Sequence, residues 1–253
     1  MGAKTALLAF ADGDIRPALL GASRSERSET EALVRRVHPG YAVEAADDGS
    51  LFEDVYPPDD ITYATKLAGV ELYCDRRLVL DRPSELPEHL RRAGAGRRIV
   101  MHGMHSVVDW LAFAVWEDGE LVRSLSLSPD GGIQENIGEP YDFELPYWAG
   151  EHPVEPVPGW PGQGPYPLPF HPLDLGEEAL RALFGFAIEG YPDPADADTE
   201  AVHLHGFRVT DPTGAEQGTR EAEYAEARRL MGPPRLFRMG PDGTMHEVSL
   251  DSL

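Results

Sequence analysis

The stretch SVVDWLAFAVWEDGELVRSLSLSPDGG, residues 106–132, decides the fold class of this chain. It contains two apolar or alternating runs, joined by Glu117-Asp118-Gly119-Glu120. Asp-Gly between two such runs is a strong hairpin signal, because the turn needs positive φ angles that glycine adopts at little cost. We therefore predict strands at 107–116 and 121–128. In the second strand three serines share one face, which we expect to face solvent or to line a groove.

Strand and helix signals alternate on the N-terminal side of this hairpin. Apolar runs predict strands at 3–11, 41–45, 70–74 and 97–104. Ser28 with Glu31 forms a capping box for one helix, and Ser84 caps another that extends to Arg92. Such βαβ-like alternation favours a mixed or partly parallel sheet. The sequence therefore predicts an α+β fold, with a single mixed β-sheet, flanking helices and a central β-hairpin.

Residues 140–172 differ in composition from the rest of the chain. Ten of these 33 residues are Pro and seven are aromatic. A flexible linker rarely carries so many aromatic side chains, so we predict a long ordered loop that packs them on the domain surface. Beyond it, helices are predicted at 177–184 and 220–231, a strand at 201–209 and a hairpin around Pro241-Asp242-Gly243. We expect one domain over 1–208 and a C-terminal extension over 209–253.

The negative charge of the chain is concentrated in its middle. The 253 residues include 22 Lys or Arg and 44 Asp or Glu, a net charge of −22. Residues 105–206 hold 19 of the acidic residues and only Arg123 and Arg181 as basic ones. Nucleic-acid binding through phosphates needs a basic face, and an acidic field repels anionic membranes, so both classes of partner are excluded. The same field attracts cationic partners and metal ions.

Targeting signals are not recognisable in the sequence. The N-terminal stretch MGAKTALLAFADGD lacks the long apolar core of a signal peptide, and no apolar run is long enough to span a membrane. Cys74 is the single cysteine, so the fold contains no internal disulfide. We therefore expect a cytoplasmic protein.

Common catalytic motifs are absent, including G-x-G-x-x-G, G-x-x-x-x-G-K-[ST], G-x-S-x-G and H-E-x-x-H. Histidines near carboxylates are the remaining metal candidates, because neutral imidazole and carboxylate are ordinary zinc or iron ligands. One such group is His102, His105 and Asp109, although strand alternation places the two histidines on opposite faces unless Gly103 makes a turn. His203 and His205 alternate on a predicted strand and share one face. Hydrogen-bonded structural histidines are the other interpretation of both pairs.

A second set of candidates lies in the loops after the hairpin. An acid beside a histidine can act as a general acid/base pair when folding brings them together. The catalytic candidates are Asp130, Glu135, Glu151, His152 and His171. Turn and capping chemistry is the alternative interpretation of these polar residues.

A third set suits recognition of a ligand or partner. Aromatic groups interleaved with carboxylates are typical of surfaces that bind Arg or ammonium groups. The predicted contact residues are Tyr147, Trp148, Trp160, Arg123 and Asn136.

Four blocks of the chain resemble a family of uncharacterised actinobacterial proteins. They are MGAKTALLAFADGD (1–14), MHSVVDWLAFAVWEDGELVRSLSLSPDGGIQENIGEP (104–140), PYWAGEHP (146–153) and YPLPFHPLDLGEEALRALFG (166–185). The resemblance covers roughly residues 1–190. It implies an actinobacterial cytoplasmic protein and supplies no activity, cofactor or catalytic residue.

Two functions are consistent with these patterns. The first is an acidic binding protein that recognises a cationic protein or a small ligand, with immunity-like masking of a basic toxin as one instance. The alternative is a hydrolase or metal-dependent enzyme that uses the loop carboxylates and histidines around 102–171. No cofactor is predicted for the first, whereas the second admits a divalent metal. A structural or regulatory subunit is a third possibility, and the oligomeric state is open.

Overall fold

The computed structural model describes residues 2–155, 165–191, 193–231, 236–239 and 245–248. Contacts between Cα atoms divide the chain into two units, Met1–Thr210 and Asp211–Leu253. Trp160 lies outside the described residues. Among the helices that are described, every one is too short or too polar to cross a lipid bilayer.

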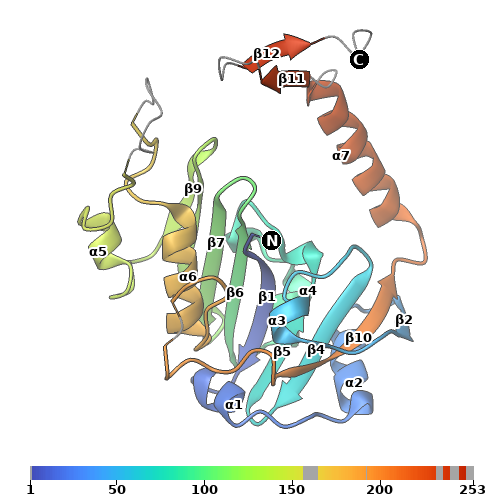
Figure 1. Ribbon diagram of the computed structural model, residues 1–253. Helices are drawn as coiled ribbons and strands as arrows, with labels where there is room; N and C mark the ends of the chain where they lie inside the picture. The colour runs from blue at the N-terminus through green and yellow to red at the C-terminus, as the bar shows by residue number, and fades with distance from the viewer. Residues whose placement is uncertain (1, 156–164, 192, 232–235, 240–244, 249–253) are drawn as a thin grey trace. The chain divides into compact units, whose positions relative to one another are not determined.

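A ten-stranded sheet forms the centre of the first unit (Figure 1). Its strands run in the spatial order β2-β10-β4-β5-β1-β6-β7-β8-β9, and the short β3 also pairs with β10. The strands are β1 (Lys4–Ala11), β2 (Ala42–Ala45), β3 (Gly49–Ser50), β4 (Ile61–Leu67), β5 (Val70–Cys74), β6 (Arg98–His105), β7 (Trp110–Glu117), β8 (Glu120–Ser128), β9 (Gly132–Ile137) and β10 (His203–Thr210). The apolar run of β1 explains its central position, because residues 5–11 are buried on both faces.

All pairings in this sheet are antiparallel among the described residues, so the expectation of a mixed or partly parallel sheet is wrong. A strand that follows a helix does not pair with the strand that precedes that helix, as it would in a parallel βαβ unit. After the first helices the chain enters β2, which lies at the far edge beside β10, and β5 reaches β1 only through the β4–β5 hairpin. The α+β class itself is confirmed, with about 29% helix and 30% strand.

The central hairpin is confirmed as β7 and β8. Its turn residues Asp118 and Gly119 have φ angles of 52° and 83°. Two consecutive positive φ angles match the twist of the flanking strands, which is why Asp-Gly is favoured there. The serine face of β8 is buried rather than open: Ser124 donates to Glu135, and Ser126 donates to Gln134 Oε1 at 3.1 Å.

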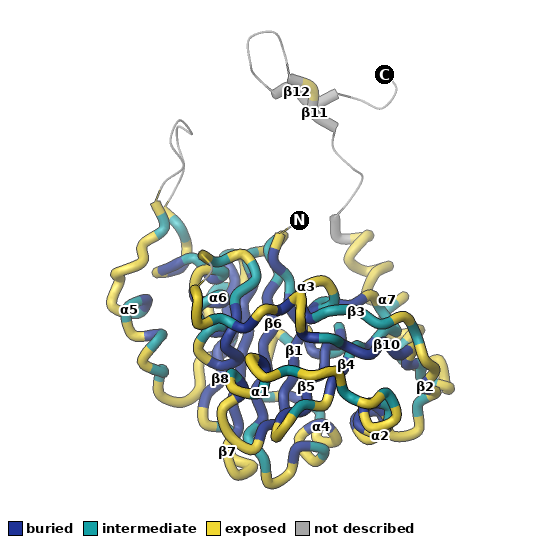
Figure 2. The backbone as a smooth tube through the Cα atoms, turned by 60° about the horizontal axis from the view of Figure 1, so that its bottom comes forward, coloured by how far each residue is buried: buried dark blue, intermediate teal, exposed yellow. Residues whose placement is uncertain are grey.

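Helices cover both faces of the sheet, and the apolar residues form one core on each face. The α-helices of this unit are α1 (Arg16–Leu20), α2 (Arg27–Val37), α3 (Leu51–Asp54), α4 (Glu88–Ala93), α5 (Leu145–Trp148) and α6 (Pro172–Leu183), and 3₁₀ turns occupy η1 (Arg76–Leu78) and η2 (Pro83–Glu85). Alternate sheet residues such as Leu7 and Phe113 pack with α1, α3 and α6, and we call this side the α6 face. Intervening residues such as Leu8 and Trp116 pack with α2 and α4 on the α2 face. Figure 2 shows the resulting buried strands between more exposed segments.

Three of the predicted helices differ from the structure. The capping box expected at Ser28 lies inside α2, whose N-cap is Glu26 without a side-chain cap. The helix predicted at 177–184 starts earlier, at Pro172, because the His171 side chain caps it and Pro fits the first helical position. The helix predicted after Ser84 is divided into η2 and the short α4.

The described part of the Pro/aromatic segment packs on the α6 face and includes the short helix α5, while residues 156–164 of the predicted ordered loop lie outside the described residues. Phe170 is fully buried, and Tyr147 and Trp148 contact its ring edge-on at centroid distances of 5.4 and 5.0 Å. Tyr141 and Phe143 stack on one another at 5.7 Å and also contact this core.

The second unit contains α7 (Ala215–Met231) and a two-stranded ladder of β11 (Leu236–Met239) with β12 (Met245–Val248). The predicted turn at Pro241-Asp242-Gly243 lies outside the described residues. The Thr213 hydroxyl donates to Asp211 at 2.7 Å, and the Asp211 carboxylate also accepts from the Glu216 amide at 3.2 Å. The second contact satisfies one of the amides that the first turn of a helix leaves unpaired.

Candidate functional site

His102 is a buried side chain whose two ring nitrogens are both occupied. Nδ1 lies 2.8 Å from the Thr5 hydroxyl, and Nε2 lies 3.0 Å from the Gly176 carbonyl oxygen. Complete burial lowers its pKa to about 3, so the imidazole is neutral. His102 therefore joins β6 to β1 and α6, and neither nitrogen is free for a metal.

His105 and Asp109 lie apart from His102. His105 points to the α2 side, where it contacts the Tyr56 ring edge-on at 5.7 Å, and its Nδ1 accepts from the Val107 amide at 3.3 Å. Asp109 Oδ2 lies 3.6 Å from His171 Nε2. The structure thus places these three metal candidates in different contacts, with the two histidines on opposite faces.

His203 and His205 share one face of β10, and Asp48 joins them there. Asp48 Oδ2 lies 3.2 Å from His203 Nε2, and Oδ1 lies 3.1 Å from His205 Nδ1. Among the described residues, these three form the group whose ligand atoms come close enough to hold a metal ion, all within 4.8 Å of one another. The sequence pattern singled out the two histidines, but nothing in it indicated Asp48.

The five predicted catalytic residues make contacts with several different parts of the chain. The structure describes all five, and no hydrogen bond or ion pair joins any two of their side chains. Glu135 accepts from the backbone amide and hydroxyl of Ser84 and from Ser124, so it fastens η2 to β8 and β9. His171 caps α6, and His152 stacks on Tyr147 at 4.2 Å.

Arg123 and Asn136 belong to a polar network whose centre, the Arg123–Glu144 pair, is buried. The Arg123 guanidinium is buried and forms two hydrogen bonds with Glu144, at 2.9 and 2.6 Å. It also donates to Asn136 at 2.6 Å, and the Trp148 indole donates to Glu144 at 3.3 Å. The structure therefore does bring three predicted contact residues together, but their polar groups bind one another.

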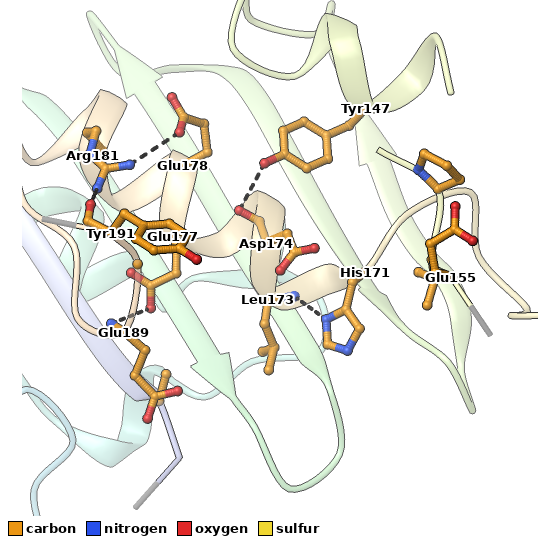
Figure 3. A pocket seen from close by; sticks show the side chains of 14 residues that line it. Tyr147, Glu155, His171, Leu173, Asp174, Glu177, Glu178, Arg181, Glu189 and Tyr191 are labelled. Carbon is orange, nitrogen blue, oxygen red and sulfur yellow. Dashed lines mark hydrogen bonds and ion pairs between the residues drawn. The ribbon is translucent and has the colours of Figure 1, made fainter. Parts of the chain in front are cut away.

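Tyr147, the residue before Trp148, lines a groove on the outer side of α6 (Figure 3). The groove has a volume of about 680 Å³. We call it the α6 groove, and it is lined by Ala3, Tyr147, Pro153, Val154, Glu155, His171, Leu173, Asp174, Glu177, Glu178, Arg181, Glu189, Gly190 and Tyr191. The lining of the groove thus contains five carboxylates and one guanidinium group, that of Arg181.

The period of α6 explains this composition. Residues 175, 176, 179, 180 and 183 are buried against the sheet. Asp174, Glu177, Glu178 and Arg181 follow one another at spacings of three, one and three residues, so they occupy the opposite side of the helix. Gly176 lets the helix approach β6 closely, because a Cβ atom there would lie 2.6 Å from the Met104 sulfur.

Some of the groove carboxylates are satisfied within the protein and others are not. Glu177 accepts from the Ile188 and Glu189 amides at 2.8 and 3.1 Å, and Arg181 is held by Asp196 at 3.1 Å and by Glu178 at 3.5 Å. In the described part of the chain, the carboxylates of Glu155, Asp174 and Glu189 have no hydrogen-bond or ion-pair partner. All three residues are exposed.

Two tyrosines border these carboxylates. Tyr147 is nearly buried, and its hydroxyl donates to the Asp174 carbonyl at 3.1 Å. Burial and then the negative charges of Glu178 and Asp174 raise the pKa of Tyr147 to about 12. Tyr191, in contrast, is 96% exposed and presents an open ring at the groove.

A second hollow adjoins the α6 groove and shares Ala3 and Glu189 with it. Its volume is about 500 Å³. Exposed apolar groups line it, including Phe52 and Val107.

Comparisons with known proteins identify the family but no activity. Neither the curated proteins nor the solved structures give a significant match. A family of unknown function, DUF6928, matches residues 5–207, which confirms the resemblance to an uncharacterised family and extends it past residue 190. The matched region ends within β10 and includes the Asp48–His203–His205 group and every residue that lines the α6 groove except Ala3. By sequence, the chain belongs to the family DUF6928.

Proposed function

We propose that this protein binds cationic groups, guanidinium or ammonium, in the α6 groove. The observation that carries the proposal is the lining of five carboxylates against one arginine that is already paired with Asp196 and Glu178. Uncompensated carboxylates at an open surface attract positive ligands and speed their association. A cationic protein or a small amine ligand is the partner expected from the sequence, and the acidic lining of the groove supports that proposal.

The groove offers three kinds of contact to such a ligand. Glu155, Asp174 and Glu189 supply acceptors for charge-assisted hydrogen bonds. The exposed Tyr191 ring supplies a face for a cation–π contact, which contributes about 0.5–1 kcal/mol at exposed sites. The adjoining apolar hollow accommodates the aliphatic stem of an Arg or Lys side chain.

Full-length protein titrated by calorimetry with a hexa-arginine peptide and with spermine tests this proposal. We expect binding of at least one probe, with an affinity that falls as salt is raised from low to physiological concentration, because the carboxylates are exposed. A hexa-glutamate peptide serves as the control ligand. Tighter binding of the peptide than of spermine favours a protein partner, such as a basic toxin, and the reverse favours a free amine.

A charge-matched pair of triple variants locates the site. E155Q/D174N/E189Q removes the unpartnered carboxylates of the groove, whereas D130N/E139Q/D142N removes three exposed carboxylates elsewhere. The first variant should weaken binding by about tenfold or more and the second should leave it nearly unchanged, since screened surface charges act over about 10 Å. Equal losses in both variants would show a diffuse acidic surface and sink the groove proposal.

The enzyme alternative has less support in the geometry. It needs the loop acids and histidines to meet at one substrate, and two of them, Glu135 and His171, are already bound to Ser84, Ser124 and the α6 N-terminus. A cytoplasmic location, the exclusion of nucleic acid and membranes, and an actinobacterial source remain predictions of the sequence.

A further inference from the structure

We propose that Asp48, His203 and His205 form a binding site for a transition-metal ion of the zinc type. The site shares no residue with the α6 groove, so it is independent of the function proposed above. Two imidazoles and one carboxylate are the donor set that Zn²⁺ and Co²⁺ accept, and Mg²⁺ and Ca²⁺ prefer oxygen alone.

A bulge in the sheet brings Asp48 to the two histidines. β10 pairs with β2 at Phe207↔Ala45 and with β3 at Leu204↔Gly49. Between these two pairs, residues 46–48 lie opposite only two residues of β10, so the strand bulges. Bulges of this kind re-aim side chains and are common beside functional sites. Here the bulge directs Asp48 onto the same side as His203 and His205.

The backbone orients the ring of His205 so that its Nδ1 points at Asp48. Its Nε2 lies 2.8 Å from the Ser25 carbonyl oxygen, which can only accept, so Nε2 carries a hydrogen. In a neutral ring Nδ1 then presents a lone pair to Asp48 Oδ1 at 3.1 Å. That nitrogen and the carboxylate oxygen are both groups that coordinate a zinc-type ion. A backbone carbonyl on the far nitrogen is also the usual orienting contact of metal-bound histidine.

The spacing of the donor atoms is compatible with a shared metal ion. The two nitrogen–oxygen distances are 3.1 and 3.2 Å. Neighbouring ligand atoms on a tetrahedral zinc ion with bonds of about 2.0–2.1 Å are separated by about 3.3 Å. Three protein ligands leave one position for water, as in zinc sites that are open to a substrate.

Two arginines compete for the same carboxylate. Arg24 reaches Asp48 Oδ2 at 2.8 Å and is 65% exposed, whereas Arg27 contacts Oδ1 and is also held by the Gly206 carbonyl at 3.2 Å. Arg24 is therefore the group that a metal ion would displace. Asp47 and Asp54 add negative charge to this region, and together with burial and Asp48 they raise the pKa of Tyr63 to about 12.

Metal binding by the untagged full-length protein tests the proposal. After chelator treatment, we expect one equivalent of Zn²⁺ in equilibrium dialysis and a visible absorption band on addition of Co²⁺. D48N and H203Q should each weaken Zn²⁺ binding by about tenfold or more and change the Co²⁺ spectrum. R24A should bind at least as tightly as the original chain, because it removes the competing cation.

The control variant is H152A, which removes an exposed histidine that stacks on Tyr147 away from this group. It should leave the stoichiometry at one, and circular dichroism should show that D48N and H203Q remain folded. If the original chain takes up no Zn²⁺, or if both variants retain it, the group is held by protons and arginines alone and the proposal is wrong. Loss of peptide binding in the groove would leave this result unchanged, so the two proposals fail separately.

Discussion

His102 illustrates how burial changes the chemistry of a single residue. Its imidazole lies between the Thr5 hydroxyl and the Gly176 carbonyl, and complete burial lowers its pKa from 6.5 to about 3. Between these two values the unfolded chain binds a proton at His102 and the folded chain does not. Stability is therefore complete above pH 6.5 and declines as the pH falls toward 3.

The H102Q variant tests this dependence, because glutamine is neutral and can both accept and donate at the same place. The free energy of unfolding of the original chain should fall more steeply than that of H102Q between pH 6.5 and 4. The difference in slope should approach about 1.4 kcal/mol per pH unit, which corresponds to one proton. Urea unfolding at pH 7, 6, 5 and 4 measures it, and parallel curves for the two proteins would contradict the buried neutral imidazole.

At the residue scale the sequence identifies chemical types but not how they are used. Arg123, Asn136 and Glu135 are of the types that bind ligands or catalyse reactions, yet each is bound to another part of the chain through Glu144, Arg123 or Ser84. Such partners lie 13 to 51 residues away, so neither composition nor periodicity reveals them. Asp48, in contrast, is not indicated by any sequence pattern, because its partners His203 and His205 follow it by 155 and 157 residues.

At the element scale, Gly206 allows the β2–β3 bulge to pack on β10. A Cβ atom at this position would lie 2.0 Å from the Asp47 carbonyl oxygen, so G206A must push residues 46–48 away from the strand. We expect a loss of about 1–3 kcal/mol in the free energy of unfolding, the usual cost of overpacking. The matched control is G13A, where a Cβ atom would meet nothing within 4 Å.

Urea unfolding of both variants provides the measurement. G206A should also weaken Zn²⁺ uptake if the metal site exists, because the same shift moves Asp48 from His203 and His205. A G206A protein as stable as G13A would mean that the bulge moves without cost and would contradict this packing.

Elements defined by local signals were predictable, whereas their pairing was not. The β7–β8 hairpin follows from Asp118-Gly119 alone, and β1, β5 and β6 follow from apolar runs. The sequence does not predict β4 or β9. The strand β9 lies at the edge of the sheet, so its sequence GIQENI is mostly polar and lacks the apolar pattern by which strands are recognised. The wrong expectation of parallel strands arose because strand–helix–strand order does not specify which strands become neighbours.

At the scale of the whole molecule, charge is the property that the sequence located best. The five carboxylates of the α6 groove all come from the strongly acidic stretch 105–206. Their convergence needed the fold, because α6 provides three of them and the segments around residues 155 and 189 provide the others. The core of the first unit is likewise built from non-local pairings around β1 and β10, with β10 as the last strand of its sheet in the chain.

The division at residue 210 leads to a prediction about the extension. The described side chains of α7 are almost all exposed, and the core clusters of the first unit contain no residue beyond Val209. A chain ending at residue 212 retains all of β10 and should fold with a free energy of unfolding within about 0.5 kcal/mol of the full-length value, as surface changes usually do. Because the groove residues lie between positions 3 and 191, the same truncation should also preserve hexa-arginine binding.

A matched truncation after residue 202 removes β10 from between β2 and β4 and should abolish folding. Calorimetric and urea unfolding of the three chains distinguish these outcomes. A large loss of stability in the 1–212 chain would show that the extension belongs to the folding unit.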